Sequence, residues 1–268
     1  MLSLQTFIVD SFTDRPFSGN PAGVQFVDTE STERMQNVAL ELGCSETAFI
    51  RESETSGEFS IRFFSPKREI PLCGHATLAA ARVVMDKLAI ADVCFRTLSG
   101  LQVRTRSVGS LIEMDFPVYS LEPAKPNGAM LRALGVEETN YWGFNRELNI
   151  LVIEIGSAEE LVALKPDYRA LENSHSSISG VSVTAKGDES YDFYSRYFWP
   201  WSGTNEDPVT GGTHTFLAGY WGAKTGKSQL RSYQASKRGG WMEVELISDE
   251  AMKIRGQACI VLEGKMYT

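Results

Sequence analysis

Cysteine and histidine are scarce in this sequence, and their scarcity argues against two kinds of scaffold. The 268 residues include four cysteines and three histidines. No two cysteines form a CxxC pair, and the histidines lack the HxxxH spacing that is typical of a metal site. We therefore expect free thiols in a reducing cytoplasm, with no disulfide framework and no structural metal.

An excess of positive charge and long apolar runs are also lacking. The net charge is -8 at pH 7 and the isoelectric point is about 5.1, so the chain lacks the basic surface that nucleic acids require. No apolar stretch is long enough to cross a membrane. The opening "MLSLQTFIVD" has no basic segment before its short apolar run, so we expect no signal peptide.

The common signatures of cofactor and nucleophile sites are missing as well. The sequence has no GxGxxG, no HExxH and no GxSxG. The stretch "GAKTGKS" ends like a phosphate-binding loop. However, Gly222 lies one residue too close to Gly226, and the stretch follows an expected helix instead of a strand. We therefore expect neither a nucleotide nor another cofactor.

The sequence does contain two halves with the same order of elements. Each half has several expected strands and one glycine-rich loop that leads into an apolar helix, with "CGHATLAAA" and "TGGTHTFLAGYW" in corresponding places. This pattern predicts an α+β fold in which a sheet curls around a central helix twice. Prolines crowd residues 117–128, so we predict domains at residues 1–117 and 128–268.

The first candidate site is the Cys73-Gly74-His75 stretch. It lies at the first turn of the expected helix, where free backbone N–H groups bind anions and favour a thiolate. Cys73 is therefore a candidate nucleophile or base, and His75 a candidate binding or acid/base group. The alternative is that Cys73 fills a small apolar space and His75 is a buried cap.

The second candidate site is the loop "NEDPVTGGTHT". Asp207 precedes a proline at the mouth of the loop, and Gly211, Gly212 and Thr213 allow a ligand to approach the backbone closely. The alternative is an Asp-Pro turn followed by a helix cap. Together with the first loop, it would place two helix N-termini around one carboxylate-bearing substrate.

The third candidate is Glu46 in "GCSETAFI". It follows an expected helix end and begins an apolar strand, so its carboxyl group is expected to be partly buried. Burial raises a carboxyl pKa from roughly 4.3 toward neutrality, which suits general acid/base chemistry. The alternative is a glutamate at a strand edge that points into solvent.

Four long motifs, in order, identify a resemblance to a known family. "DSFTDRPFSGNPAGV", "ELGCSETAFI", "RFFSPKREIPLCGHATLAAA" and "EDPVTGGTHTFLAGYW" together resemble the phenazine biosynthesis F (PhzF) family, whose fold is similar to that of diaminopimelate epimerases. The resemblance implies two similar domains, each a β-barrel around a central helix, with the active site in the cleft between them. It also implies a cofactor-independent isomerase that forms a homodimer.

The resemblance further implies roles for particular residues. Glu46 matches the family's acid/base, whereas His75 and Asp207 match residues that bind and orient the substrate. The loop amides that hold the substrate carboxylate match Gly74, His75, Gly212 and Thr213.

Two departures keep other functions open. Related racemases use a cysteine at each of the two helix N-termini, but the second loop of this chain has none. A thiol-dependent epimerase or racemase with Cys73 as one base is therefore the alternative enzyme, and a non-catalytic binding protein is the alternative outside enzymes. Many family members also carry a serine where this chain has Gly212, so the substrate cannot be inferred from the family.

Overall fold

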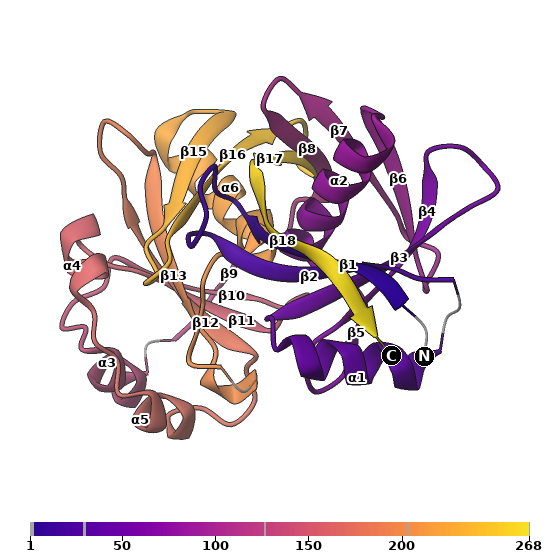
Figure 1. Ribbon diagram of the computed structural model, residues 1–268. Coiled ribbons are helices and arrows are strands. Elements are labelled where there is room, and N and C mark those ends of the chain that lie inside the picture. The colour runs from indigo at the N-terminus through magenta and orange to yellow at the C-terminus, as the bar shows by residue number, and fades with distance from the viewer. Residues whose placement is uncertain (1–2, 29–30, 126, 203, 268) are drawn as a thin grey trace. The chain divides into compact units, whose positions relative to one another are not determined.

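The computed structural model describes residues 3–28, 31–125, 127–202 and 204–267, and it divides into two compact units. Unit 1 contains residues 1–116 and 253–268, and unit 2 contains residues 117–252. Residue 126, in the expected boundary region, lies outside the described residues. The labels of Figure 1 are used below.

Unit 1 is a mixed sheet with two helices. Its strand β2 runs parallel to β3, and β4 runs parallel to β6, while the other pairs between β1 and β8 are antiparallel. Each parallel pair requires a crossover connection, which α1 and α2 supply. The elements are β1 (Ser3–Ser11), β2 (Asn20–Phe26), α1 (Thr32–Leu42), β3 (Glu46–Glu52), β4 (Glu58–Phe64), β5 (Glu69–Ile70), α2 (Gly74–Leu88), β6 (Asp92–Thr97), β7 (Gln102–Val108), β8 (Leu111–Pro117), β17 (Ala251–Gly256) and β18 (Ala258–Tyr267).

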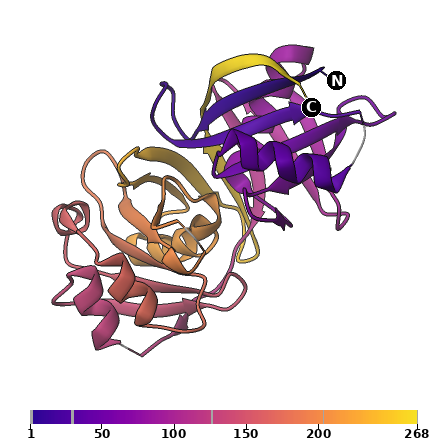
Figure 2. The same ribbon diagram turned by 60° about the horizontal axis from the view of Figure 1, so that its bottom comes forward.

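The last strands of the chain complete unit 1. Strand β18 pairs antiparallel with β1, and β17 pairs with β8. In Figure 1 the yellow β18 lies against the indigo β1, and in Figure 2 the two chain ends lie side by side. Because β17 leads directly into β18, the sheet curls round on itself. The predicted C-terminal domain of residues 128–268 is therefore wrong at its end, since residues 253–268 belong to unit 1.

Helix α2 is the centre of unit 1. It contacts strands β1, β2, β3, β6, β7 and β18. Residues 75–81 are all buried, as are Val83, Val84 and Met85. This burial explains why the helix sequence is apolar on nearly every face, because a surface helix would carry a polar stripe.

Unit 2 repeats the order of pairing. Strand β11 runs parallel to β12, and β13 runs parallel to β15, while β10–β11, β12–β13 and β15–β16 are antiparallel. Helices α4 and α5 lie in the crossover from β11 to β12, and α6 lies in the crossover from β13 to β15. The elements are β9 (Glu122–Pro123), α3 (Gly128–Leu134), β10 (Tyr141–Asn145), β11 (Ile150–Glu154), α4 (Ala158–Ala163), α5 (Tyr168–Asn173), β12 (Gly180–Lys186), β13 (Phe193–Phe198), the 3-10 helix η1 (Pro200–Ser202), β14 (Glu206–Asp207), α6 (Gly211–Thr225), β15 (Gln229–Gln234) and β16 (Gly240–Leu246).

The match between the units confirms the predicted structural repeat. Helix α6 corresponds to α2, because each follows a two-residue strand and crosses between parallel strands. Pro166 lies between α4 and α5, where a proline interrupts helical hydrogen bonding. None of the four cysteines, all of which lie among the described residues, forms a disulfide. In the part of the chain that the structure describes, no helix is long and apolar enough to span a membrane.

Candidate active site

The N-termini of α2 and α6 differ from those of the other α-helices. The N-cap residues of α2 and α6 are Cys73 and Thr210, and neither side chain accepts a hydrogen bond from the first turn of its helix. A capping side chain normally satisfies such amide groups. In the other α-helices the N-cap side chain does accept such a hydrogen bond. These N-cap residues are Ser31, Asn127, Ser157 and Asp167. The two central helices therefore begin with backbone donors that no capping side chain occupies.

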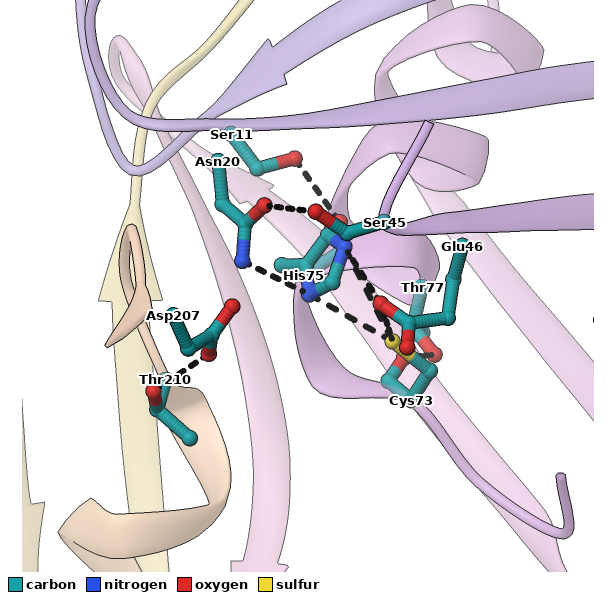
Figure 3. Close-up of polar contacts among 9 residues, drawn as sticks. All are labelled: Ser11, Asn20, Ser45, Glu46, Cys73, His75, Thr77, Asp207 and Thr210. Atoms are coloured by element: carbon teal, nitrogen blue, oxygen red, sulfur yellow. Dashed lines mark hydrogen bonds and ion pairs between the residues drawn. The ribbon is translucent and has the colours of Figure 1, made fainter. Parts of the chain in front are cut away.

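Three chemically active side chains meet at the start of α2. Cys73 Sγ lies 3.4 Å from His75 Nδ1 and 3.8 Å from Glu46 Oε2, and His75 Nε2 lies 3.3 Å from the same Glu46 oxygen (Figure 3). All three are buried, with 6% of Glu46 and 5% of His75 exposed. The structure thus brings Glu46 to the loop that contains the first candidate site, and it confirms the expected burial of Glu46.

Two further polar residues set the orientation of the His75 ring. Ser45 Oγ donates to Asn20 Oδ1 at 3.1 Å, so the Asn20 amide turns its NH₂ group toward His75 Nδ1, 3.3 Å away (Figure 3). Nδ1 then accepts, which leaves the ring hydrogen on Nε2. Nε2 is the ring nitrogen that lies 3.3 Å from the Glu46 carboxylate. The network therefore defines both the tautomer of His75 and the side of Glu46 that it contacts.

His75 is a neutral group in this network. Burial lowers the pKa of His75 from 6.5 to about 3, because a low-dielectric surrounding disfavours the imidazolium ion. At neutral pH the uncharged ring therefore lies 3.3 Å from the Glu46 carboxylate without forming an ion pair with it. It can therefore hold the carboxylate in place while adding no positive charge that would weaken its basicity.

The same cluster contains ligand types that could bind a metal ion. The ligand atoms of Glu46, Cys73 and His75 lie within 4.8 Å of one another, a group that the sequence pattern did not reveal. However, the tautomer above leaves a hydrogen on Nε2, the ring nitrogen that faces the carboxylate 3.3 Å away. A metal bound at that nitrogen would first have to displace this hydrogen.

Asp207 lies in the loop before α6, which corresponds in unit 2 to the loop before α2. Its carboxylate accepts a hydrogen bond from the hydroxyl of Thr210, the N-cap residue of α6 (Figure 3). Gln234 binds the same loop, because its Oε1 accepts from Thr210 N at 2.9 Å and its Nε2 donates to Asp207 O at 2.8 Å. Asp207 is buried, with 6% exposed. The loop therefore holds the Asp207 carboxylate against the N-cap residue of α6.

The first turn of α6 combines buried polar groups with open space. Thr213 Oγ1 donates to Thr210 O, and His214 Nδ1 lies 2.9 Å from the same carbonyl oxygen. A Cβ atom added at Gly212 would meet only Leu148 Cδ1, at 3.7 Å. That is ordinary van der Waals contact, so this glycine is not required by packing. Its lack of a side chain leaves room at the helix N-terminus.

The loops before α2 and α6 share a sequence pattern that begins several residues before each helix. Residues 69–75 read "EIPLCGH" and residues 206–212 read "EDPVTGG". Both begin on a two-residue strand that pairs with the preceding long strand, and the two pairings have the same register. The correspondence pairs Ile70 with Asp207, Cys73 with Thr210, and His75 with Gly212.

Glu46 has no acidic counterpart in unit 2. It is the first residue of β3, and the first residue of the corresponding β12 is Gly180. A Cβ atom at Gly180 would lie 2.5 Å from Tyr197 Oη, so a side chain there would require the tyrosine ring to move. Burial, and then the charge of Asp207, raise the pKa of Tyr197, which keeps this phenol protonated.

The sequence-predicted residues therefore fall into two groups. Glu46, Gly74 and His75 lie together in unit 1, while Asp207, Gly212 and Thr213 lie together in unit 2. Sequence reasoning missed Asn20, Ser45 and Gln234. Asn20 lies inside the quoted motif "DSFTDRPFSGNPAGV", which was the available signal, whereas nothing local marked Gln234.

Comparison with known proteins extends over the whole chain. Residues 9–264 match the family model described as "Phenazine biosynthesis-like protein". The chain is 37% identical to the human phenazine biosynthesis-like domain-containing protein, with 99% of each chain covered. It is also 38% identical to a protein of Pseudomonas aeruginosa described as an uncharacterized isomerase, covering 99% of this chain and 100% of that one.

Some solved structures are similar to this chain in both sequence and fold, and others in fold alone. A PhzF-family phenazine biosynthesis protein of Enterococcus faecalis is 34% identical and superposes with a TM-score of 0.92, with 100% of each chain covered. A hydroxyproline epimerase of Agrobacterium vitis is 11% identical with a TM-score of 0.62, over 98% of this chain and 92% of that one. The second likeness is one of fold, and it agrees with the predicted epimerase-like architecture.

Proposed function

The chain belongs to the phenazine biosynthesis-like family, and on that premise we propose that it is a cofactor-independent isomerase of a small carboxylate-bearing metabolite. Isomerase activity in general accords with the names of relatives from Halalkalibacterium halodurans and Pseudomonas aeruginosa. The finer proposal is that Glu46 is the group that moves the proton.

One observation carries this proposal, which is the difference between the two repeats. Glu46 is buried beside His75 and Cys73, whereas the corresponding positions of unit 2 are Gly180, Gly212 and Thr210. A racemase of the two-thiol type needs a base on each face of the substrate. This chain has a thiol at one helix N-terminus only, which favours a single acid/base that removes and returns the proton.

The step proposed for Glu46 is redox-neutral. The carboxylate takes a proton from a carbon that the substrate's conjugated or carbonyl group acidifies, and the C–H electron pair moves into that π-system. The protonated Glu46 then delivers the proton to another carbon of the same system. His75, neutral at physiological pH, orients the carboxylate through its Nε2 hydrogen.

The substrate carboxylate is proposed to bind at the two helix N-termini. Their first turns lack side-chain caps, and the partial positive charge of a helix N-terminus favours an anion. Gly74 and His75 would supply amides from α2, and Gly212 and Thr213 from α6. Asp207 would accept a hydrogen bond from a polar group of the substrate and orient it.

The test is proton exchange in heavy water. Small carboxylates that carry an acidic C–H bond are incubated with the enzyme, and deuterium at carbon and the position of double bonds are followed by NMR. We expect a positional isomer, with deuterium wherever the proton exchanges with solvent before its return. Inversion at a single carbon, with every double bond left in place, would instead identify the thiol-dependent epimerase.

Two other expectations from the family resemblance have direct tests. A homodimer is checked by light scattering coupled to size-exclusion chromatography. A non-catalytic binding protein would bind a carboxylate, measured by calorimetry, without catalysing exchange at carbon under any of the conditions above.

A further inference from the structure

A buried arginine and a glutamate join two strands just before α2. Arg62 of β4 contacts Glu69 of β5 through two hydrogen bonds, Nε to Oε1 at 2.7 Å and Nη2 to Oε2 at 2.8 Å. Only 8% of Arg62 is exposed. This is the bidentate geometry in which the planar guanidinium group matches a carboxylate.

Unit 2 contains the same pair at the corresponding place. Arg196 of β13 donates to Glu206 of β14, Nε to Oε1 at 2.7 Å and Nη2 to Oε2 at 2.9 Å. Each guanidinium also lies over the phenylalanine two residues further along its strand, at 5.2 Å from the Phe64 ring and 4.8 Å from the Phe198 ring. The two pairs therefore share both their partners and their packing.

Each pair lies at a constant distance from a helix N-terminus. Glu69 precedes the N-cap residue Cys73 by four positions, and Glu206 precedes the N-cap residue Thr210 by four positions. A proline stands two positions after each glutamate and restricts the backbone between them. The glutamate of each pair thus lies at the same distance before its helix in both units.

Each arginine also connects its loop to the other crossover helix of its unit. Arg62 Nη2 donates to Thr32 Oγ1 at 2.8 Å, at the first residue of α1. Arg196 Nη1 donates to Leu161 O at 3.2 Å and to Leu164 O at 2.8 Å, at the end of α4. Each arginine therefore holds three segments that are distant in sequence.

We propose that the pairs Arg62–Glu69 and Arg196–Glu206 are positioning devices, one for each helix N-terminus of the site. The first holds the loop that carries Cys73 and His75, and the second holds the loop that carries Asp207 and Thr210. A lysine would keep the charge but lose the fork that fixes the angle of the loop. The importance of the pairs for catalysis rests on the proposed function, whereas their action on the loops does not.

The test is a crossover of two variants, Arg62→Met and Arg196→Met, read by amide hydrogen exchange in the intact protein. We expect Arg62→Met to speed exchange in residues 70–77 by about tenfold to a hundredfold, the equivalent of losing a charge-assisted hydrogen bond, and to leave residues 207–215 unchanged. Arg196→Met should give the reverse result. Equal acceleration of both loops, or of neither, overturns the proposal.

A second readout reports on the site itself. In the Arg62→Met variant, iodoacetamide should alkylate Cys73 about tenfold faster, because the loop that buries the thiol opens more often. Arg196→Met should leave this rate unchanged, and so should Arg106→Met, which removes an exposed ion pair with Asp92. Peptide mass spectrometry at residue 73 measures the rate.

Conservative variants keep the test valid if the methionine variants fail to fold. Arg62→Lys and Glu69→Gln each retain one contact, and both should accelerate exchange in residues 70–77 less than Arg62→Met does. Exchange at wild-type rates in both would overturn the proposal. An enzyme whose loops respond as expected but which catalyses no proton shift would refute the proposed function and leave the positioning role intact.

Discussion

The two loops that begin α2 and α6 share the residues that shape the backbone and differ in the residues that carry chemistry. Both have a glutamate held by an arginine, a proline two positions later and a glycine at the first helical residue. In unit 1 the loop adds a thiol and an imidazole, whereas unit 2 has a hydroxyl and a glycine at those positions. The repeat therefore preserved the geometry while the two sites diverged.

The divergence extends to the strand that lies beside each loop. Unit 1 begins β3 with Glu46, but unit 2 begins β12 with Gly180, over which Tyr197 packs. Unit 2 instead has Asp207 where unit 1 has Ile70. A buried carboxylate thus lies near each helix N-terminus, but on a different element in each unit. Glu46 contacts a histidine and a cysteine, whereas Asp207 contacts the hydroxyl of Thr210. This difference is what the following predictions are designed to break or sharpen.

The largest effect is expected at Glu46. Glu46→Gln keeps the shape of the side chain but removes its ability to accept a proton, so the rate of isomerisation should fall by about 10²- to 10⁴-fold or more. The matched control is Glu52→Gln, at the exposed end of the same strand, which should retain the wild-type rate. A fully active Glu46→Gln enzyme would show that Glu46 is not the base.

The next effect concerns the acid sensitivity of both units. Burial lowers the pKa of His75 from 6.5 to about 3 and that of His214 from 6.5 to about 4. The unfolded chain therefore binds these protons first, so the free energy of unfolding should fall as the pH drops below 6.5. As the pH falls from about 8 to about 4.5, each histidine should lower the free energy of unfolding by about 2–3 kcal/mol.

Urea unfolding at several pH values measures this loss. His75→Gln and His214→Gln should each make the free energy of unfolding less dependent on pH in that range, and by similar amounts. If only one variant did so, the two helix N-termini would differ in burial as well as in chemistry. A wild-type protein whose stability is constant from about pH 8 to about pH 4.5 would contradict both pKa directions.

Asp207 is expected to have a smaller effect than Glu46. Asp207→Asn removes a charged hydrogen-bond acceptor that Thr210 contacts, and such a bond is worth about 1.5–3 kcal/mol, or roughly tenfold to a hundredfold. Because the role proposed for Asp207 is binding and orientation, KM should rise more than kcat falls. A loss of kcat equal to that of Glu46→Gln would instead make Asp207 a second acid/base.

Cys73 is expected to matter less still. Cys73→Ala removes one buried sulfur atom, so it should cost about 1 kcal/mol of stability and leave most of the activity. Thr210→Cys, which would give both helices a thiol, should not produce a racemase. An inactive Cys73→Ala enzyme beside an active Glu46→Gln enzyme would reverse the assignment and place this protein among the thiol racemases.

The smallest expected effect is that of metal removal. A proton shift through Glu46 requires no Lewis acid, so exhaustive dialysis against a chelator should leave the rate of isomerisation unchanged. The control is the same enzyme dialysed without chelator and assayed in parallel. Loss of activity that returns on adding a divalent cation would assign the cluster of Glu46, Cys73 and His75 to a metal instead.

Local patterns predicted much of this fold. Gly43 ends α1 in the left-handed conformation, with φ of 63°, and the strand that begins at Glu46 follows directly. The helix ends and strand starts were therefore visible in the sequence, because glycine, proline and apolar periodicity act over a few residues. The same signals located the two central helices and both candidate loops.

Local patterns could not predict contacts between residues that are distant in sequence. The pairing of β18 with β1 joins the two ends of the chain, so the domain boundary drawn from local composition was wrong there. Asn20, which orients His75 from 55 positions away, gave no sign of its partner. The arginine pairs lay within quoted or neighbouring stretches, yet their meaning depended on the strand pairing that brings them together.

The sequence by itself determined the elements, the family and the residues at the two helix N-termini, because each of these depends on short patterns of residue type. Only the tertiary structure decided that Glu46, Cys73 and His75 form one hydrogen-bonded cluster, that His75 is neutral within it, and that Tyr197 covers the corresponding place in unit 2. Burial and hydrogen-bond geometry set protonation and direction, and both arise only when strands from distant parts of the chain pack together.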